Sequence, residues 1–403
     1  MPGPIHGTKV LELAQIMAGP SCGLLLADLG ADVVKIEKIP DGDDTRRFTP
    51  PEINGEAAAF MTMNRNKKGF ALDLKSKEGK EVFKRMAKKA DVIIENFRKG
   101  TLEKLGIGYD ELKKINPKII LCEISGYGRT GPYADKGGFD LVAQGMSGLM
   151  SITGESSDKP PMKVGAPITD ITAGILGATG VLAALIHRDK TGEGQRVDTS
   201  LYEAGIIHTY WQSAITSATG KSPGPLGSAH PLTAPYQAFK TKDKWITVGA
   251  SNQNNWINLI EALGRKDLQE DKRFNSNANR MKNLKQLVEI LNREIIKKSS
   301  NEWLKIFDQK GLPCGPINTI EEMFEDSHTK HRKMIIEVKN TKAGIFKSIG
   351  MPIKFSKSKT VKSKGAPIFG EHTIEVLIDY DFNRAEIDNL IKNKIIYSSS
   401  EYA

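Results

Sequence analysis

The sequence predicts an α/β protein with a large Rossmann-like domain on a parallel sheet and a smaller α+β domain. Short apolar runs alternate with helical stretches through the first part of the chain, which is typical of βαβ units. From about Tyr236 the pattern changes to a hairpin followed by helices. A length of 403 residues also favours two domains over one core.

The first predicted unit is a strand over Val10-Leu11-Glu12-Leu13, a helix over residues 21–29 and a strand over Val33-Val34-Lys35-Ile36. The pattern repeats as a helix over 77–89 with a strand over 92–94, and as a helix over 109–115 with a strand over 118–123. Strands joined through helices by short connections predict a parallel sheet. Two further helices are expected, one rich in small residues after Asp170 and one over 201–217.

Nucleotide cofactors are not expected. Glu37 ends the second predicted strand, where a ribose-binding acid is often found. However, residues 18–23 read Ala-Gly-Pro-Ser-Cys-Gly and lack the G-x-G-x-x-G spacing that lets a backbone approach a pyrophosphate. A complete Walker-type G-x-x-x-x-G-K-[ST] motif is also absent, because Ile215 stands where Gly220-Lys221-Ser222 would need the first glycine of the motif.

The second domain is predicted to begin after the linker Ser222-Pro223-Gly224-Pro225. Strands over 236–239 and 245–248 flank the turn Thr241-Lys242-Asp243-Lys244, and helices follow over 255–263, 284–298 and 301–310. We therefore expect domains over 1–222 and 223–328, with 329–403 returning to the large domain and ending in a helix over 385–392.

The formal net charge is +10, and much of the excess lies between Lys330 and Lys364, with eleven Lys or Arg against Glu337 alone. A polyanionic partner and a solvated surface are both compatible with such a segment. Aromatic residues are scarce there, so a base-stacking surface is not expected, and nucleic acid is not a predicted partner.

No metal site is expected, because the three cysteines are far apart and the seven histidines form no ligand motif. The N-terminus lacks a secretory pattern. The longest nearly apolar run, 171–186, is shorter than the ~18–20 residues of a membrane span. The sequence therefore predicts a cytoplasmic protein without membrane contact.

Asp170 is the candidate catalytic residue, at the start of the small-residue helix. An aspartate there can serve as an N-cap for free backbone amides. The same helix end can keep a carboxylate ionised with a low pKa, ready to attack a thioester as a nucleophile. The residues alone leave both roles open.

A series of motifs runs through nearly the whole chain. They are Ala18-Gly19-Pro20, Gly30-Ala31-Asp32-Val33-Val34-Lys35-Ile36-Glu37, Gly42-Asp43-Asp44-Thr45-Arg46, Asn64-Arg65-Asn66-Lys67-Lys68, Glu95-Asn96-Phe97, Gly126-Tyr127-Gly128, Thr191-Gly192-Glu193-Gly194-Gln195, Pro313-Cys314-Gly315-Pro316 and Gly370-Glu371-His372-Thr373. In this order they resemble the family III CoA-transferases (CaiB/BaiF), the group that includes formyl-CoA transferase and α-methylacyl-CoA racemase.

The resemblance implies that Asp170 is the nucleophile of a transfer through an aspartyl anhydride and an aspartyl-CoA thioester. It also implies an interlocked homodimer. The CoA or acyl-CoA is a substrate in this family, with no tightly bound cofactor. The matching CoA-binding positions are Lys38, Leu72, Lys75, Asn96, Phe97 and Lys104.

Two departures from the family pattern bear on the reaction. The family's glycine-rich loop corresponds to residues 249–254, which hold one glycine, and oxyanion-binding amides are expected from Ala250, Ser251, Asn252 and Gln253. Oxalate-using members carry a glutamine where Met17 stands. Met17 lacks its hydrogen bonds, so oxalate is not expected, and the neighbouring Gln15 is the alternative polar contact.

A racemase is the alternative enzyme, and a non-catalytic CoA-binding protein the alternative outside enzymes. Family racemases take a histidine base from a Gly-His-Asp segment, which reads Gly138-Phe139-Asp140 here. Phe139 cannot accept a proton, so a transferase is favoured. Asp140 is expected either to support the active site or to cap a helix.

Segments 147–154, 227–230 and 235–243 look nearest to the succinyl-CoA:glutarate branch of the family. This suggests dicarboxylic acids as substrates and succinyl-CoA as donor. The distal carboxylate of such an acid needs a cation or hydrogen-bond donors, for which Arg46, Arg47 and His230 are the candidates. His230, next to Pro231, can equally be a structural turn residue.

Overall fold

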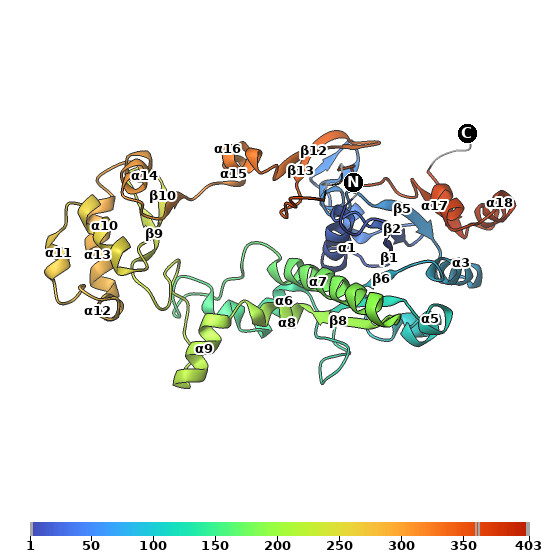
Figure 1. Ribbon diagram of the computed structural model, residues 1–403, viewed down its shortest axis with the longest axis horizontal. Helices are drawn as coiled ribbons and strands as arrows, with labels where there is room; N and C mark the ends of the chain where they lie inside the picture. The colour runs from blue at the N-terminus through green and yellow to red at the C-terminus, as the bar shows by residue number, and fades with distance from the viewer. Residues whose placement is uncertain (1–2, 359–360, 362, 400–403) are drawn as a thin grey trace. The chain divides into compact units, whose positions relative to one another are not determined.

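The protein is described by a computed structural model that covers residues 3–358, 361 and 363–399. The chain divides into two compact units (Figure 1). The large unit spans residues 1–148, 164–208 and 328–403, and the small unit spans 149–163 and 209–327. This division differs from the predicted one, because 149–163 and 209–222, both expected in the large domain, belong to the small unit.

A seven-stranded sheet forms the centre of the large unit, in the order β14-β5-β2-β1-β6-β7-β8. All neighbours are parallel except β14, which pairs antiparallel with β5. The strands are β1 (Lys9–Glu12), β2 (Asp32–Glu37), β5 (Lys68–Leu72), β6 (Val92–Glu95), β7 (Ile120–Ser125), β8 (Arg196–Ser200) and β14 (Ile396–Tyr397). The chain adds strands on one side of β1 up to β5 and then on the other side from β6, so the strand order reverses between β1 and β6.

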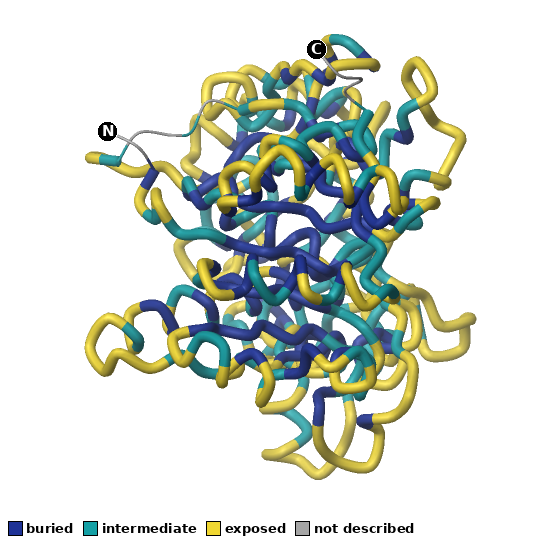
Figure 2. Tube along the Cα trace, turned by 90° about the vertical axis from the view of Figure 1, so that its right-hand side faces the viewer, coloured by how far each residue is buried: buried dark blue, intermediate teal, exposed yellow. Residues whose placement is uncertain are grey.

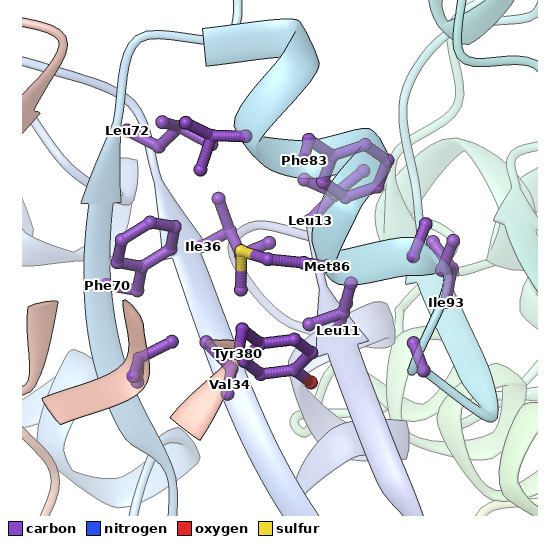
Figure 3. Packing of buried hydrophobic residues seen from close by; sticks show 14 of the residues in the cluster. Leu11, Leu13, Val34, Ile36, Phe70, Leu72, Phe83, Met86, Ile93 and Tyr380 are labelled. Atoms are coloured by element: carbon purple, nitrogen blue, oxygen red, sulfur yellow. The ribbon is translucent and has the colours of Figure 1, made fainter. Parts of the chain in front are cut away.

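One face of this sheet packs on a layer of amphipathic helices. Alternate strand residues such as Leu11, Val34 and Phe70 face Phe83 and Met86 in a closed apolar core (Figure 3). The helices of this layer are α3 (Lys77–Ala87), α4 (Thr101–Leu105), α5 (Tyr109–Ile115), α17 (Thr373–Asp379) and α18 (Arg384–Lys392).

The opposite face packs on α1 (Ala18–Asp28) and α7 (Ile168–Thr191), with α6 (Asp140–Met146) and α8 (Leu201–Ile207) beside them. Glycines let α1 and α7 come close together. A Cβ on Gly174 would lie 2.5 Å from the Cβ of Ser21 and 2.7 Å from the carbonyl oxygen of Ala18. The small-residue stretch after Asp170 thus forms a closely packed helix.

The helix α7 is 24 residues long and is apolar enough to cross a membrane by length and composition alone. The expectation that this apolar run is too short for a span is therefore wrong. One side of α7 packs against α1 and against strands β7 and β8, as the core helix of a globular fold does.

Smaller elements complete the large unit. They are η1 (Asp44–Arg47), β3 (Glu52–Ile53), β4 (Glu56–Ala57), α2 (Ala58–Met63), α16 (Ser327–His331), whose first residue the division assigns to the small unit, and the antiparallel pair β12 (Ile335–Asn340) and β13 (Gly344–Ile349). A small apolar cluster around Phe60 and Phe346 joins α2 to this pair.

The small unit is built on a three-stranded antiparallel sheet in the order β11-β10-β9. Its strands are β9 (Tyr236–Lys240), β10 (Trp245–Gly249) and β11 (Cys314–Pro316), and its helices are η2 (Leu149–Ile152), α9 (Tyr210–Thr219), α10 (Gln253–Ala262), α11 (Asp267–Glu270), α12 (Asn277–Lys282), α13 (Leu284–Ile295), α14 (Ser300–Gln309) and α15 (Ile320–Glu325). Phe239, Trp256 and Phe307 are fully buried in its core.

Each unit thus has a buried interior of its own, and buried segments alternate with exposed turns along the chain (Figure 2). The single helix predicted over 201–217 is wrong. The chain breaks after α8, at His208 and Thr209, and starts α9 at Tyr210. That break coincides with the passage from the large unit to the small one.

Candidate active site

The crevice between β1 and β6 is where a ligand site is expected in this fold. In open parallel sheets, ligands bind beyond the carboxyl ends of the strands, at the point where the strand order reverses. The side chain of Asn96, just after β6, spans this point: its Nδ2 donates to the carbonyl of Gln15 at 2.7 Å and its Oδ1 accepts from the Gln15 amide at 2.8 Å. The two loops that border the crevice are therefore joined directly.

Asp170 is the third residue of α7. The N-cap is Pro167, so the expectation that Asp170 caps the helix is wrong. Asp170 lies one turn before Gly174 and so on the same face of α7, the face that touches Ala18 and Ser21 of α1. Helices that connect parallel strands run opposite to them, so α1 and α7 both start at the carboxyl edge of the sheet. Asp170 therefore lies at that edge, beside the start of α1.

The pKa of Asp170 is raised to about 7 by burial, with a further contribution from the negative charge of Asp140. The expectation that the helix start keeps this pKa low is wrong. The desolvation of the carboxylate destabilises its charged form by more than the start of the helix stabilises it. A carboxylate with this pKa is partly protonated near neutral pH, and its ionised form is a stronger base and nucleophile than an ordinary aspartate.

Asp140 is the first residue of α6 and is held by three hydrogen bonds. Its Oδ1 accepts from the backbone amide of Thr169 at 2.9 Å and from the Thr169 hydroxyl at 2.7 Å, and its Oδ2 accepts from Gln144 at 2.7 Å. Gln144 in turn accepts from the amide of Val164 at 2.9 Å. Asp140 therefore fixes the first turn of α7, next to Asp170.

Most of the predicted CoA-binding residues follow the carboxyl ends of parallel strands. Lys38 follows β2, Lys75 follows β5, and Asn96 and Phe97 follow β6. Lys38 and Lys75 are exposed, as is Lys104 on α4, and Lys38 forms an ion pair with Asp44 at 2.9 Å. These positions share one edge of the sheet with Asp170.

Leu72 is the exception. Its side chain is 0% exposed and lies in the core of the large unit, next to Phe70 (Figure 3). An apolar residue at the end of a parallel strand is covered by the helix layer on that face. The expectation that Leu72 contacts CoA is therefore wrong for its side chain.

A pocket of about 490 Å³ opens beside the end of β6, with Glu123 of β7 and the first part of β8, Arg196 and Asp198, in its lining. Its floor is a set of buried ion pairs. Arg129 contacts both Glu95 and Glu123, the latter at 3.1 Å, and donates to the carbonyl of Phe97 at 3.0 Å. Arg98, Lys99 and Thr101 also line this pocket. Arg129 thus fixes the backbone of the loop that carries Asn96.

Gln15 and Met17 remain partly exposed on the loop after β1, between buried neighbours on both sides. Met17 is the N-cap residue of α1, without a side-chain cap. The position of Asp170 beside the start of α1 puts it near this loop. The structure therefore brings Asp170, Asp140, Gln15, Met17 and Asn96 to one end of the large unit.

The two arginine candidates are already engaged within the protein. Arg46 forms a two-pronged pair with Glu37, at 2.6 and 2.8 Å, and its guanidinium stacks over Phe60 at 3.5 Å. Its environment is that of an internal structural residue. Arg47 is half exposed and pairs with Asp44 at 2.6 Å, in a contact that water and salt weaken.

The remaining predicted site residues, His230 for the substrate carboxylate and residues 250–253 for the oxyanion, lie in the small unit. His230 sits between the rings of Trp211 and Tyr236, and its Nδ1 accepts from the amide of Leu232 at 3.1 Å, which is the geometry of a turn residue. The Nδ1 atom is therefore unprotonated when this bond is made, and Nε2 carries the proton. That leaves one N–H of the ring as a donor.

In the loop after β10, Ala250 is buried and its amide donates to the carbonyl of Pro235 at 2.9 Å, so the expectation that this amide binds an oxyanion is wrong. Asn252 caps α10, accepting from the amide of Asn255 at 2.8 Å. The side chain of Gln253 accepts from Arg280 at 3.0 Å. Ser251, Asn252 and Gln253 are exposed.

Several charged side chains that are buried close to the site were not predicted as site residues. Glu12, Lys35, Glu95 and Glu123 are all buried within apolar parallel strands. A charged residue inside such an apolar run is rare unless it is paired. The sequence pattern at these positions could therefore have predicted buried ion pairs. Thr169 and Gln144, in contrast, are ordinary polar residues whose role depends on Asp140. Among the described residues, no three His, Cys, Asp or Glu side chains are grouped to hold a metal ion.

The chain is similar over most of its length to known CoA-transferases. The model of the family described as CoA-transferase family III matches residues 5–373. The succinate–glutarate CoA-transferase of Agrobacterium fabrum is 37% identical over 94% of this chain and 96% of its own length. The succinyl-CoA:glutarate CoA-transferase of Mus musculus is 34% identical over 98% of this chain and 90% of its own.

A solved structure shares the fold. The crystal structure of a CAIB/BAIF family protein from Brucella suis has a TM-score of 0.84 and 38% sequence identity, and the match covers 94% of this chain and 100% of that one. The family model, the relatives and the fold agree with the sequence motifs. The chain therefore belongs to family III of the CoA-transferases.

Proposed function

We propose that this enzyme transfers CoA from succinyl-CoA to a second dicarboxylic acid through covalent intermediates on Asp170. The observation that carries the proposal is the place of Asp170: a partly buried carboxyl group with a pKa of about 7, at the start of α7 and beside the crevice between β1 and β6. The raised pKa makes the ionised carboxylate a better nucleophile than a solvated one.

In the first half-reaction, a carboxylate oxygen of Asp170 attacks the thioester carbonyl of the donor. The carbon–sulfur bond breaks, CoA thiolate leaves, and an acyl-aspartyl anhydride remains. The thiolate then attacks the Asp170 carbonyl of this anhydride, which expels the donor acid and leaves an aspartyl-CoA thioester.

In the second half-reaction, the acceptor carboxylate attacks the aspartyl thioester and expels the thiolate, which forms a second anhydride. The thiolate attacks the acceptor's carbonyl in this anhydride, so the acceptor leaves as its CoA thioester and Asp170 is restored as a carboxylate. No proton is gained or lost over the cycle. Water must be excluded throughout, because it would hydrolyse either anhydride.

Asp140 supports this chemistry in two ways. Its charge helps to raise the pKa of Asp170, and its bonds to Thr169 hold the turn that carries the nucleophile. The exposed lysines Lys38, Lys75 and Lys104, together with Asn96 and Phe97, are the proposed contacts of CoA, whose phosphates favour cations. The pocket beside the end of β6 offers space close to the loop that carries Asn96 and Phe97.

The substrate class follows from the relatives. Two of them are named for the transfer of CoA between succinate and glutarate, at 37% and 34% identity. A dicarboxylic acceptor needs a partner for its distal carboxylate, and Arg47 and the Nε2 donor of His230 are the proposed partners. Ser251, Asn252 and Gln253 stay proposed as backbone donors to the oxyanions.

A homodimer is proposed as the working assembly. Large apolar side chains are exposed on neighbouring elements of the large unit, among them Phe139 (69%), Leu141 (54%) and Ile175 (47%). Such a surface favours burial against a second copy. Sedimentation should give twice the chain mass of 44.3 kDa, and a monomer would contradict the assembly. The cytoplasmic location and the absence of nucleic-acid and membrane partners stay predictions of the sequence.

The test is to incubate the purified protein with succinyl-CoA and a panel of mono- and dicarboxylic acids, with oxalate included, and to detect new CoA thioesters by mass spectrometry. Succinate release with a glutaryl- or similar dicarboxyl-CoA product is expected. Hydroxylamine should attack the activated Asp170 carbonyl, expel CoA or the donor acid and leave a hydroxamate that peptide mapping places on Asp170, and Asp170→Ala should abolish exchange. CoA binding without any exchange would show a non-catalytic binding protein instead.

A further inference from the structure

A buried cluster of four charged side chains lies under the loop after β1. It consists of Glu12, Lys35, Asp43 and Lys67, each at most 4% exposed. Lys35 lies between the two acids, 2.7 Å from Asp43 and 3.0 Å from Glu12, and Lys67 lies 2.8 Å from Glu12. Two positive and two negative groups thus balance each other inside the large unit.

This charge cluster is bonded to the backbone of the loop at consecutive points. Lys35 Nζ donates to the carbonyl of Ala14 at 2.5 Å, and the amide of Ile16 donates to the carboxylate of Asp43 at 3.2 Å. Lys67 Nζ donates to the carbonyl of Pro20, in the first turn of α1, at 2.9 Å. The cluster therefore holds the loop from below on both sides of Gln15 and at the helix that follows.

Asp43 is itself fixed in place. Its Oδ1 accepts from the amide of Thr45 at 2.9 Å and from the Thr45 hydroxyl at 2.8 Å, and its own amide donates to Glu37 at 3.0 Å. Burial alone would raise the pKa of Asp43, but Lys35 and the hydrogen bonds of Thr45 lower it to about 2. Asp43 is therefore a permanently charged acceptor at a fixed position.

The loop needs such an acceptor, because Ile16 has a φ of 69°. A β-branched residue rarely adopts this left-handed conformation, and one that does so is held there by its surroundings. The amide of Ile16 points at Asp43, and the neighbouring Gln15 is held by Asn96 on the other side. The unusual backbone thus lies between two fixed side chains, at the crevice between β1 and β6.

Stability alone is a weak reason for this arrangement. Taking four charges out of water is costly, and apolar residues of similar size often stabilise a fold as well or better. The cluster does, however, determine the backbone conformation of residues 14–16, because it binds the carbonyl of Ala14 and the amide of Ile16. Gln15, Ile16 and Met17 are all partly exposed there, and they lead into the start of α1, which approaches α7 one turn from Asp170.

We propose that Asp43 and Lys35 are positioning residues for the CoA transfer proposed above, on which this inference rests. They hold the backbone of Ala14 and Ile16 in one unusual conformation. In this way they keep Gln15 and Met17 at a fixed place beside Asp170, where the acyl group of the bound thioester has to lie.

Asp43→Asn tests this, since it keeps the size of the side chain and removes the charge that Lys35 and the Ile16 amide bind. The matched control is Asp28→Asn. Asp28 is a buried carboxylate at the other end of α1, paired with Arg65 and bonded to Asn66 at 2.7 Å. We expect Asp43→Asn to lower kcat/KM for the acyl-CoA at least about tenfold, mainly through kcat, because small misplacements near the reacting atoms slow the chemical step.

The control should lose stability but keep kcat/KM within about twofold of the unmodified enzyme. A second-site rescue separates positioning from folding. Asparagine adopts left-handed conformations more readily than isoleucine. The double variant Asp43→Asn with Ile16→Asn should therefore be at least about threefold more active than Asp43→Asn alone. Unchanged activity in Asp43→Asn, an equal loss in Asp28→Asn, or no rescue by Ile16→Asn would each overturn the proposal.

Amide hydrogen exchange gives a readout that does not depend on the reaction. Asp43→Asn should speed exchange at Gln15, Ile16 and Met17, and Asp28→Asn should not. If the unmodified enzyme transfers no CoA, the proposed function fails while this measurement still reports on the loop. If Asp43→Asn alone does not fold, the double variant with Ile16→Asn should, and failure of both would show that the cluster serves the fold rather than the loop.

Discussion

Asp140 and Thr169 are joined by two hydrogen bonds to a single oxygen, one from the Thr169 amide at 2.9 Å and one from its hydroxyl at 2.7 Å. Thr169 is fully buried and directly precedes the proposed nucleophile. The contact links the start of α6 to the start of α7, although 29 residues separate the two side chains. The position of Asp170 therefore depends on a residue that need not touch the substrate.

Removing one of these bonds should affect stability and activity together. Thr169→Val keeps the shape of the side chain and the backbone amide but loses the hydroxyl. We expect a loss of about 1–2 kcal/mol in the free energy of unfolding, because the lost bond is to a charged acceptor, and a several-fold fall in kcat. Urea unfolding and CoA-exchange kinetics measure the two effects. Thr169→Ser, which retains the hydroxyl, is the control and should stay near the unmodified enzyme.

The rate of CoA exchange should depend on the ionisation of Asp170. Its pKa is raised to about 7 and the nucleophile is the carboxylate, so kcat/KM should rise from pH 5, with an inflection near 7, and level off above 8. Asp140→Asn removes the charge that adds to the effect of burial, so its inflection should move to lower pH. A flat profile between pH 5 and 8 would contradict the assignment of Asp170 as nucleophile with this pKa.

The same carboxylate should lower the stability of the protein. The folded-state pKa of about 7 exceeds the value of 3.8 for a free aspartate, so the native state holds the proton more tightly than the unfolded chain. Stability from this group is full below the unfolded pKa and is lost as pH rises through 7. Asp170→Asn has no titrating group at this position, so it should raise the free energy of unfolding at pH 8 by up to about 4 kcal/mol.

Thermal unfolding of Asp170→Asn against the unmodified enzyme at pH 5 and pH 8 measures this effect. The increase in Tm should be larger at pH 8, where the carboxylate of the unmodified enzyme is charged. A fall in Tm at pH 8 would mean that the ionised carboxylate stabilises the fold, in conflict with its raised pKa.

Much of the large unit could be predicted from local patterns, because a parallel sheet is covered on both faces and its strands read as apolar runs. The strands near Val10, Val33, Val92 and Ile120 and the helices predicted over 21–29, 77–89 and 109–115 are present, with bounds within a few residues of the predicted ones. The break in the helix predicted over 201–217 has no such local signal, since it falls at His208 and Thr209, neither of which is a helix breaker.

The identity of Asp170 as the candidate nucleophile came from motifs, but its electrostatics could not be predicted locally. Its pKa depends on burial and on Asp140, which α6 brings into place. Arg46 was expected to bind substrate, yet it pairs with Glu37 at the end of β2. Leu72 was expected to contact CoA, yet it is core. In each case a contact made only in the folded chain decides the role of the residue.

The thiols should be protected in the native protein. All three cysteines are free, with Cys22 and Cys122 buried and Cys314 partly exposed. A hydrogen bond with Cys122 and burial raise the pKa of Cys22, and burial raises the pKa of Cys314, so the thiolate forms of Cys22 and Cys314 are scarce at pH 7. A thiol reagent should label Cys314 alone, slowly, in the native state and all three in denaturant. Rapid native labelling that persists in Cys314→Ser would contradict the packing of α1 on β7.

The close approach of α1 and α7 should be essential for activity, because it places the start of both helices at the crevice. In Gly174→Ala the new Cβ would meet the Cβ of Ser21 at 2.5 Å and the carbonyl of Ala18 at 2.7 Å, so the helices must separate. We expect a loss of about 2 kcal/mol in unfolding free energy and at least a tenfold fall in kcat/KM, because Asp170 lies one turn away. Gly165→Ala is the matched control, since nothing lies within 4 Å of its added Cβ. Equal activity in the two variants would show that the reaction tolerates a shift of α7. The spacing of α1 and α7 would then not be what positions Asp170.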